Sequence, residues 1–322
     1  MNYFHELALG IASGGMPAKE DLDRLLSLPY PEVSTLFYGA DMLRRKYFGS
    51  RISLCTITNA KSGKCAEDCA FCAQSSHYQG AAQVYPLKKA RELADTGKSV
   101  AGSDIKRFSM VTSGRSLSPD EVMEVAHAVR ELAGEKIRTC ASLGILEATD
   151  LDHLKQAGLE RYHHNLETAP GFFQKVCTTH DIIHRIETVD RAKKAGLSVC
   201  SGGVFGLGET DAQVVELALT LRDLDVDAVP VNFLVPIPGT PLENIPRITP
   251  LRCLKINSLM RYILPDREII ICGGRMENLR ELHSLIFLAG ASGLMTGNYL
   301  TTSGRSLEED LRLIRDLGLE TD

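Results

Sequence analysis

The sequence alternates short β-rich runs with amphipathic stretches whose apolar residues recur at spacings of three and four. The predicted strands are 51–58, 106–112, 136–143, 160–167, 197–206, 228–235, 267–274 and 292–298. Helical patterns such as PDEVMEVAHAVRELAG and DIIHRIETVDRAKKAG lie between them. Strands that alternate with helices form parallel sheets, and eight strands fit a closed (β/α)8 barrel. We therefore predict an α/β fold of the TIM-barrel type, with an open doubly wound sheet as the alternative.

Residues 1–50 differ from this pattern and read as a helical extension. DLDRLL and the stretch from Pro31 to Tyr47 have helical periodicity, and we expect them to cap the barrel or its edge. The tail SLEEDLRLIRDLG predicts a final helix. No linker, short repeat or low-complexity segment interrupts the chain. We predict an N-terminal helical extension, 1–50, and one barrel domain with a C-terminal helix, 51–322.

Composition narrows the class of protein. Of the 322 residues, 44% are hydrophobic and 24% are charged, which is typical of a globular protein with a sizeable core. The net charge of −5 argues against nucleic acid or an anionic membrane as the main partner. No apolar run approaches the roughly 18 residues of a spanning helix, and the first residues lack the pattern of a signal peptide. We predict a cytoplasmic protein, in which the nine cysteines indicate metal binding or catalysis.

Three cysteines crowd the segment KCAEDCAFC, at Cys65, Cys69 and Cys72. This segment follows the first predicted strand, at the end where barrel enzymes build their sites. Thiolate is the ligand that iron–sulfur clusters and zinc select. The alternatives are a Cys3His zinc site with His77, three inert buried thiols, or a [4Fe–4S] cluster with one open iron. An open iron can bind a substrate or cofactor directly.

The pattern C-x3-C-x-aromatic-C, with Phe71 before the last cysteine, resembles the radical S-adenosylmethionine (radical SAM) enzymes. From about residue 35 to the end, the chain resembles the biotin synthase family. The matching stretches are NAKSGKCAEDCAFCAQSSHY, YHHNLET, VCSGGVFGLGET, VPVNFLVPIPGTPL and GGR. The resemblance implies a [4Fe–4S] cluster whose open iron chelates S-adenosylmethionine and yields a 5′-deoxyadenosyl radical. It further implies two rounds of hydrogen abstraction that convert dethiobiotin to biotin, an electron donor such as flavodoxin or ferredoxin, and a homodimer.

The same resemblance assigns roles to particular residues. Asn165 and Glu167 are expected to hold S-adenosylmethionine, with Glu167 accepting from the ribose hydroxyls. The family usually has Asn and Asp in this motif, whereas this chain has His163 and Glu167, and the role of His163 stays open. Arg185 matches a position near the carboxylate of S-adenosylmethionine, although a surface helix arginine is the alternative.

Two further parts of the matching stretches concern the adenine and the substrate. Gly206 and Gly208, with Gly202 and Gly203, are expected to let backbone approach the adenine, or to form a tight strand-to-helix turn. Asn232 matches the residue that hydrogen-bonds the ureido ring of dethiobiotin, since an amide offers a donor and an acceptor.

The family's sulfur source is an auxiliary cluster, in its familiar form a [2Fe–2S] cluster held by three cysteines and an arginine. Cys140, Cys200 and Arg275 match three of these positions, but the remaining cysteine position is Ser109. An uncharged serine is a poor substitute for thiolate.

Two other cysteines offer a replacement. Cys55 and Cys272, with Cys140 and Cys200, would place one cysteine on each of four odd-numbered strands, whose side chains share an interior layer. We therefore predict an auxiliary four-iron cluster held by these four thiolates in one layer, with Arg275 nearby as a donor or occasional ligand and a [2Fe–2S] cluster as the alternative. Small buried hydrophobes are the other interpretation of Cys55 and Cys272. Cys177 and Cys253 receive no role.

Two other classes of protein remain open. A related radical enzyme, of the hydrogenase maturase or methylornithine synthase type, would share the barrel and the first cluster. It would not be expected to need interior cysteines beside Asn232 and Arg275. A non-enzymatic zinc or iron carrier would explain the cysteine loop but leaves Asn165, Glu167, Asn232 and Arg275 without a purpose.

Overall fold

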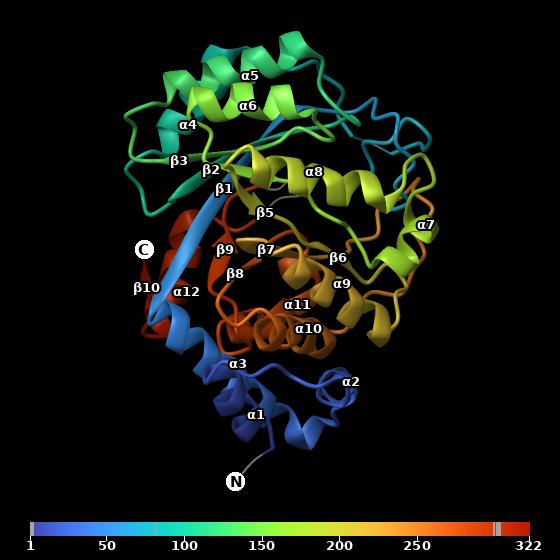
Figure 1. Cartoon of the computed structure of the whole chain (residues 1–322), viewed down its shortest axis with the longest axis vertical. Coiled ribbons are helices and arrows are strands. Elements are labelled where there is room, and N and C mark those ends of the chain that lie inside the picture. The colour runs from blue at the N-terminus through green and yellow to red at the C-terminus, as the bar shows by residue number, and fades with distance from the viewer. Residues whose placement is uncertain (1–2, 81, 299, 301–303) are drawn as a thin grey trace.

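The computed structural model describes the chain except residues 1–2, 81, 299 and 301–303, and its centre is a closed ring of parallel strands (Figure 1). The ring consists of β1 (Arg51–Lys61), β2 (Arg107–Thr112), β3 (Arg138–Ser142), β4 (Arg161–His163), β5 (Ser198–Cys200), β7 (Ala228–Phe233), β8 (Glu268–Ile271) and β9 (Gly293–Met295). Neighbours in this order are hydrogen-bonded, and β9 pairs with β1 to close the ring. The predicted (β/α)8 barrel is confirmed, and the open sheet is excluded.

The fifth predicted strand, 197–206, is divided in the structure. β5 ends at Cys200 and β6 (Gly203–Phe205) resumes after two residues, pairing with β7. The break passes close to β7, because a Cβ at Gly202 would lie 2.1 Å from the carbonyl oxygen of Pro230. Only glycine permits this approach. A short strand, β10 (Glu320–Thr321), pairs with the start of β1 outside the ring.

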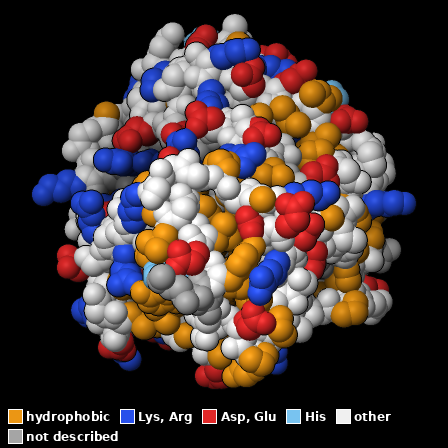
Figure 2. All heavy atoms as spheres, turned by 60° about the horizontal axis from the view of Figure 1, so that its bottom comes forward, with side chains coloured by type: hydrophobic (Ala, Val, Ile, Leu, Met, Phe, Trp, Pro, Cys, Tyr) orange, Lys and Arg blue, Asp and Glu red, His pale blue; other side chains and the backbone are white. Residues whose placement is uncertain are grey.

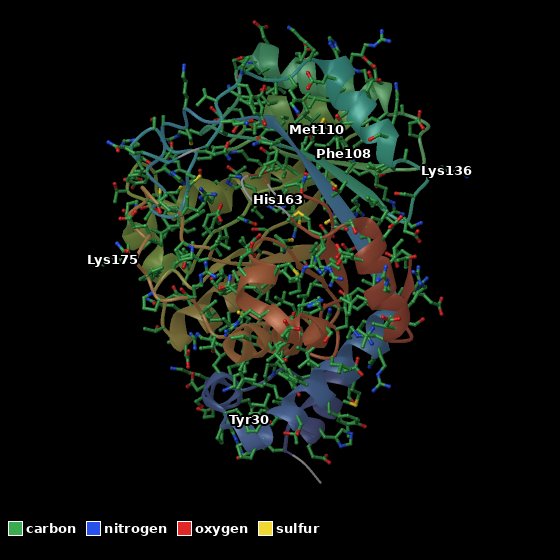
Figure 3. All side chains as sticks on the ribbon, turned by 180° about the vertical axis from the view of Figure 1, so that it is seen from behind. Tyr30, Phe108, Met110, Lys136, His163 and Lys175 are labelled. Carbon is green, nitrogen blue, oxygen red and sulfur yellow. The ribbon has the colours of Figure 1, made fainter. Side chains whose placement is uncertain are left out.

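An outer layer of helices covers the ring (Figure 1). It contains α4 (Ala90–Val100), α5 (Pro119–Glu131), α6 (Ala148–Ala157), α7 (Phe173–Val176), α8 (Ile182–Lys194), α9 (Asp211–Asp223), α10 (Pro250–Ile263), α11 (Arg275–Leu279) and α12 (Leu307–Asp316), with 3-10 turns at Pro170–Phe172 and Arg280–Ile286; a further 3-10 turn, Tyr30–Glu32, lies among the N-terminal helices. Side-chain caps begin several helices; Ser118, for example, accepts from the Glu121 amide. Phe108 and Met110 on β2 are buried in the hydrophobic core (Figure 3), whereas the alternate residues Arg107 and Ser109 line the barrel cavity.

The N-terminal helices α1 (Tyr3–Ala12), α2 (Lys19–Ser27) and α3 (Val33–Phe48) lie at one end of the molecule, where Figure 3 labels Tyr30. They pack on α9 and α10 of the outer layer. The buried hydroxyl of Tyr262 on α10 donates to the carbonyl oxygens of Phe4 and Leu36, at 3.2 and 3.3 Å. None of the helices in the described residues is long and apolar enough to cross a bilayer.

Candidate active site

The cysteine loop follows β1 and turns sharply at its start. Gly63 and Lys64 have φ values of 76° and 50°, in the left-handed region. The amide oxygen of Gln74 accepts from Ser62 Oγ and from the Gly63 amide, at 3.0 and 3.1 Å. The Cys65 amide donates to the carbonyl of the same Gln74 at 3.0 Å. These bonds fold residues 62–76 back on themselves, so that Cys65, Cys69 and Cys72 belong to one compact loop.

The spacing of the thiols distinguishes a cluster from a single ion. In a tetrahedral zinc site, thiolates about 2.3 Å from the metal lie about 3.8 Å apart. Among the described residues, neither the loop thiols nor the four interior thiols form a group whose ligand atoms all lie within 4.8 Å of one another. His77 is exposed, and its Nε2 is hydrogen-bonded to the Ala66 carbonyl at 2.9 Å. The thiols are not placed around a single zinc ion, so this arrangement gives no support to a Cys3His zinc site.

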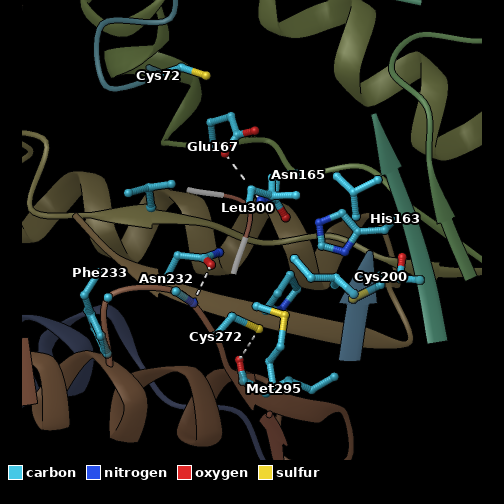
Figure 4. Close-up of a pocket in the computed structure, with 18 of the residues that line it drawn as sticks. Cys72, His163, Asn165, Glu167, Cys200, Asn232, Phe233, Cys272, Met295 and Leu300 are labelled. Carbon is cyan, nitrogen blue, oxygen red and sulfur yellow. Dashed lines mark hydrogen bonds between the residues drawn. The ribbon is translucent and has the colours of Figure 1, made fainter. Parts of the chain in front are cut away.

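A cavity of about 320 Å³ extends from this loop into the barrel (Figure 4). Cys72 lies at the upper end of the cavity in this view, with Glu167 and Asn165 beneath it, and Phe71 also lines the cavity. Burial raises the pKa of the Cys72 thiol to about 11. The thiol therefore keeps its proton until a metal displaces it.

Asn165 and Glu167 follow β4, and the divided fifth strand, β5 and β6, holds them in place. The side-chain oxygen of Asn165 accepts from the Gly202 amide at 3.2 Å. Glu167 has a φ of 69°, a conformation that costs a non-glycine residue about 1–2 kcal/mol. A Cβ at Gly203 would lie 2.6 Å from the Glu167 carbonyl oxygen. Glycine at 202–203 thus allows the strained turn that directs the Glu167 carboxyl into the cavity (Figure 4).

Arg185, on α8, reaches this pair from outside the ring. Its Nη1 donates to the Asn165 carbonyl at 2.9 Å and lies 3.4 Å from Glu167 Oε1. Its side chain is only 12% exposed, so it is not a surface arginine. Burial raises the pKa of Glu167, and the charge of Arg185 opposes this shift.

The barrel register sorts the interior side chains into layers. Two inward-facing residues share a layer when one is reached from the other by moving two strands around the ring, through the paired residues, and then two residues toward the C-terminus. From Cys55 this rule leads to Cys140, then to Cys200 and Ile270, and from Ile270 back to Cys55. Three of the four predicted thiols therefore share one layer. Cys272 lies two residues beyond Ile270, two layers nearer the C-terminal ends of the strands. The structure differs here from the prediction of four thiols in one layer. The alternation of side chains along a strand shows which residues face inward, but it does not show their level along the barrel axis, because neighbouring strands are staggered.

The second, fourth, sixth and eighth strands of the ring (β2, β4, β7 and β9) place Ser109, His163, Pro230 and Met295 in the layer between. All of these side chains line the cavity with the four cysteines. Figures 3 and 4 show His163 inside the barrel, near Cys200. Burial and the charge of Arg161 lower the pKa of His163 to about 4, so its ring is neutral at pH 7. Burial raises the pKa of Cys200 to about 12.

Two buried arginines below the thiols were missed by the sequence analysis. Arg107 Nη1 lies 3.9 Å from Cys140 Sγ, and the charge of Arg161 lowers the pKa of the same thiol, against the larger effect of burial. Arg161 is paired with Glu268 at 2.7 Å. Each arginine lies two residues before an inward-facing side chain, Arg107 before Ser109 and Arg161 before His163. Because side chains two residues apart on a strand share a face, this spacing is the signal that would have predicted both arginines to face inward. They place positive charge where thiolates need it.

Asn232 lines the middle of the cavity, and backbone fixes its amide. Its Oδ1 accepts from the Gly273 amide at 3.0 Å, and its Nδ2 donates to the Gly203 carbonyl at 3.2 Å. One N–H and one lone pair stay available for a ligand.

Arg275 begins α11 and is fully buried. Its Nη1 and Nη2 donate to the two carboxylate oxygens of Asp310 on α12, at 2.9 and 3.0 Å. It is absent from the described residues that line the cavity. This pairing gives no support to the predicted role of Arg275 as an occasional cluster ligand.

The glycine turn after β6 lies beside the cavity and not in its described lining. Gly206 and Gly208 have φ values of 96° and 101°. The carboxylate of Glu209 accepts from the amides of Gly206 and Leu207, at 2.9 and 2.8 Å. The geometry fits the tight strand-to-helix turn, the second of the two predicted roles.

The barrel and its cysteine loop define a radical SAM enzyme. The family model "Radical SAM superfamily" matches residues 60–221, and "Biotin and Thiamin Synthesis associated domain" matches 230–320. The biotin synthase of Desulfatibacillum aliphaticivorans is 51% identical over 98% of this chain and 96% of its own, and that of Geobacter sulfurreducens is 49% identical over 99% and 98%. The chain belongs to the biotin synthase family. Methylornithine synthase shares the fold, with a TM-score of 0.85 and 22% identity over 98% of this chain and 97% of its own.

Proposed function

We propose that this enzyme inserts a sulfur atom into dethiobiotin to form biotin. One observation carries the proposal: a single cavity joins Cys72 of the cysteine loop to the four interior cysteines, with Asn165, Glu167 and Asn232 between them. The proposed site for radical formation and the proposed sulfur store would thus share one cavity inside the barrel. A barrel interior suits the reaction, because a primary carbon radical must be kept from solvent and other hydrogen donors.

Cys65, Cys69 and Cys72 would hold a [4Fe–4S] cluster, and S-adenosylmethionine would occupy its open iron. When bound, this cofactor pair supplies a 5′-deoxyadenosyl radical that abstracts hydrogen from an unactivated carbon. Glu167 would bind the ribose hydroxyls; its strained backbone, packed against Gly203, directs its carboxyl into the cavity. Arg185 would bind the carboxylate of S-adenosylmethionine.

Asn232 would hold the ureido ring of dethiobiotin through its remaining donor and acceptor. The bonds to Gly273 and Gly203 support this role, since they prevent the amide from turning. The fixed amide orients the substrate between the two ends of the cavity.

Cys55, Cys140, Cys200 and Cys272 would hold the auxiliary cluster that donates sulfur. A cubane presents four irons at the corners of a tetrahedron. Three thiols share one layer and the fourth lies nearer the C-terminal ends of the strands, beyond the layer of Ser109 and His163, so the four thiols are not coplanar, as a cubane requires. We therefore favour a four-iron cluster over a [2Fe–2S] cluster.

We further propose a homodimer, reduced by a flavodoxin or ferredoxin, in the cytoplasm. Hydrophobic side chains are exposed at the end that carries the N-terminal helices (Figure 2), among them Tyr30 at 80%, Met16 at 57% and Tyr38 at 54%. All nine cysteines are free thiols, which supports a reducing compartment. Because α1–α3 pack on α9 and α10, residues 1–50 are best regarded as an extension of one barrel domain.

The test is anaerobic reconstitution followed by turnover. With dethiobiotin, S-adenosylmethionine and a reductant, we expect biotin by mass spectrometry; its absence from a fully loaded protein would refute the proposal. The Cys65/Cys69/Cys72 triple alanine variant should make no biotin yet retain a four-iron Mössbauer signal. A two-iron signal would support a [2Fe–2S] auxiliary cluster, and loss of all iron would remove the sulfur donor.

A further inference from the structure

Behind the cysteine loop lies a buried group that the proposed function does not use: Glu67, Cys177 and His180. His180 Nδ1 is 3.3 Å from Cys177 Sγ and also bonds Glu67 Oε2, which lies 4.0 Å from the same sulfur. These ligand atoms all lie within 4.8 Å of one another, as in a small metal site. Glu67 stands in the loop between Cys65 and Cys69, so the group adjoins the proposed cluster.

The hydrogen bonds argue against a metal ion in this group. Arg185 Nε lies 2.9 Å from His180 Nε2. A guanidinium only donates, so His180 Nε2 must present its lone pair, and the ring proton must be on Nδ1. A metal on Nδ1 would move that proton to Nε2, where it would face the N–H of Arg185. The group is therefore a hydrogen-bonded chain that runs from Glu67 through His180 to Arg185.

We propose that His180 is a positioning residue, which ties Arg185 to the cysteine loop and so aims its guanidinium at the carboxylate of S-adenosylmethionine. Nη1 is fixed by the Asn165 carbonyl and Glu167, and Nε by His180. Within the described part of the chain, Nη2 has no recorded partner and is the group left to bind the ligand. The inference rests on the role proposed above for Arg185.

Phe173 and the loop contacts support a directing role over a merely structural one. The ring of Phe173 packs edge-on against His180, with centroids 5.3 Å apart, and lies 5.7 Å from the Arg185 guanidinium carbon. The loop is anchored independently of His180, because Asp68 Oδ1 accepts from the amides of Thr178 and Thr179, at 2.8 and 3.2 Å. Loss of the imidazole should leave this anchor intact and release Arg185.

The test compares substitutions that keep different halves of the imidazole. His180→Gln places an acceptor near the position of Nε2, His180→Asn keeps only a donor near Nδ1, and His180→Ala keeps neither. The exposed His153 on α6, changed to Gln, is the matched control. Dissociation constants are measured on anaerobically reconstituted protein of equal iron content, for S-adenosylmethionine and for 5′-deoxyadenosine, which has no carboxylate.

We expect His180→Ala and His180→Asn to weaken S-adenosylmethionine binding about 10-fold or more, the range of a lost charge-assisted bond. The Gln variant and the His153 control should stay near the parent, and 5′-deoxyadenosine should bind all of them equally. Equal losses for both ligands, or no loss in His180→Ala, would overturn the inference.

Arg185→Gln separates the two levels of the argument. If it weakens S-adenosylmethionine selectively while His180→Ala does not, the inference on His180 fails and the role of Arg185 stands. If it weakens both ligands alike, the proposed role of Arg185 fails, and the inference fails with it.

Discussion

The buried ion pair between Arg275 and Asp310 offers a quantitative test of what Arg275 does. Both side chains are fully buried, and two parallel bonds of 2.9 and 3.0 Å join them. Removing one partner of such a pair costs about 3–5 kcal/mol when the remaining charge has no other partner. Arg305 Nε lies 3.8 Å from Asp310 Oδ1 and would still compensate that carboxylate in part. We therefore expect Asp310→Leu to lower the free energy of unfolding by up to this amount, and Arg275→Met to lower it by less. The double substitution removes both charges, so it should cost less than either single one.

The assay is urea unfolding of the reduced apoprotein, followed by far-UV circular dichroism, for the four corners of this double-mutant cycle. Iron per chain and the Mössbauer spectrum are then measured on each reconstituted variant. A structural Arg275 requires that both single variants, once folded, load the same clusters as the parent. Single costs below about 1 kcal/mol, or additive costs, would refute the reasoning. An auxiliary cluster altered only by Arg275→Met would show that Arg275 is a ligand after all.

Three further outcomes are expected. Cys272→Ser should remove the iron and sulfide of the auxiliary cluster, about four irons per chain, whereas Cys253→Ser in the core of α10 should not, as elemental analysis would show. In the apoprotein, the pKa of His163 is about 4 in the folded state and about 6.5 in the unfolded state, so stability should decrease as the pH is lowered from about 6.5 to about 4, by up to about 3 kcal/mol, and His163→Gln should flatten this dependence in urea unfolding. Arg107→Met should raise the pKa of Cys140 further, because it removes the nearby cation, and thus slow alkylation of this thiol in the apoprotein at fixed pH.

The strands of the ring and the cysteine loop were predictable because their signals in the sequence are local. Alternating patterns located the strands of the ring, and a motif of eight residues located the cysteine loop. The division of the fifth strand was missed, since nothing in SGG shows that Pro230, almost thirty residues later, passes within reach of a Cβ. The pairing of Arg275 with Asp310 and the chain from Glu67 to Arg185 were missed for the same reason. Their partners lie 35 and more than 100 residues apart, and no period in the sequence relates them.

The levels of the interior cysteines along the barrel axis show the same limit of prediction from sequence. These levels also bear on why position 109 is a serine. Parity correctly indicated that Cys55 and Cys272 face inward, but only the register shows that Ile270 occupies the fourth place in the layer of Cys55. Cys272 stands two layers higher, because the layer that contains Ser109 lies between. A cysteine at 109 would therefore be a fifth thiol beside the four of the proposed cluster site. Under the proposed ligand set, Cys272 would supply from above the ligand that a cysteine at 109 would supply from the side, so serine at 109 would not deprive the cluster of a ligand.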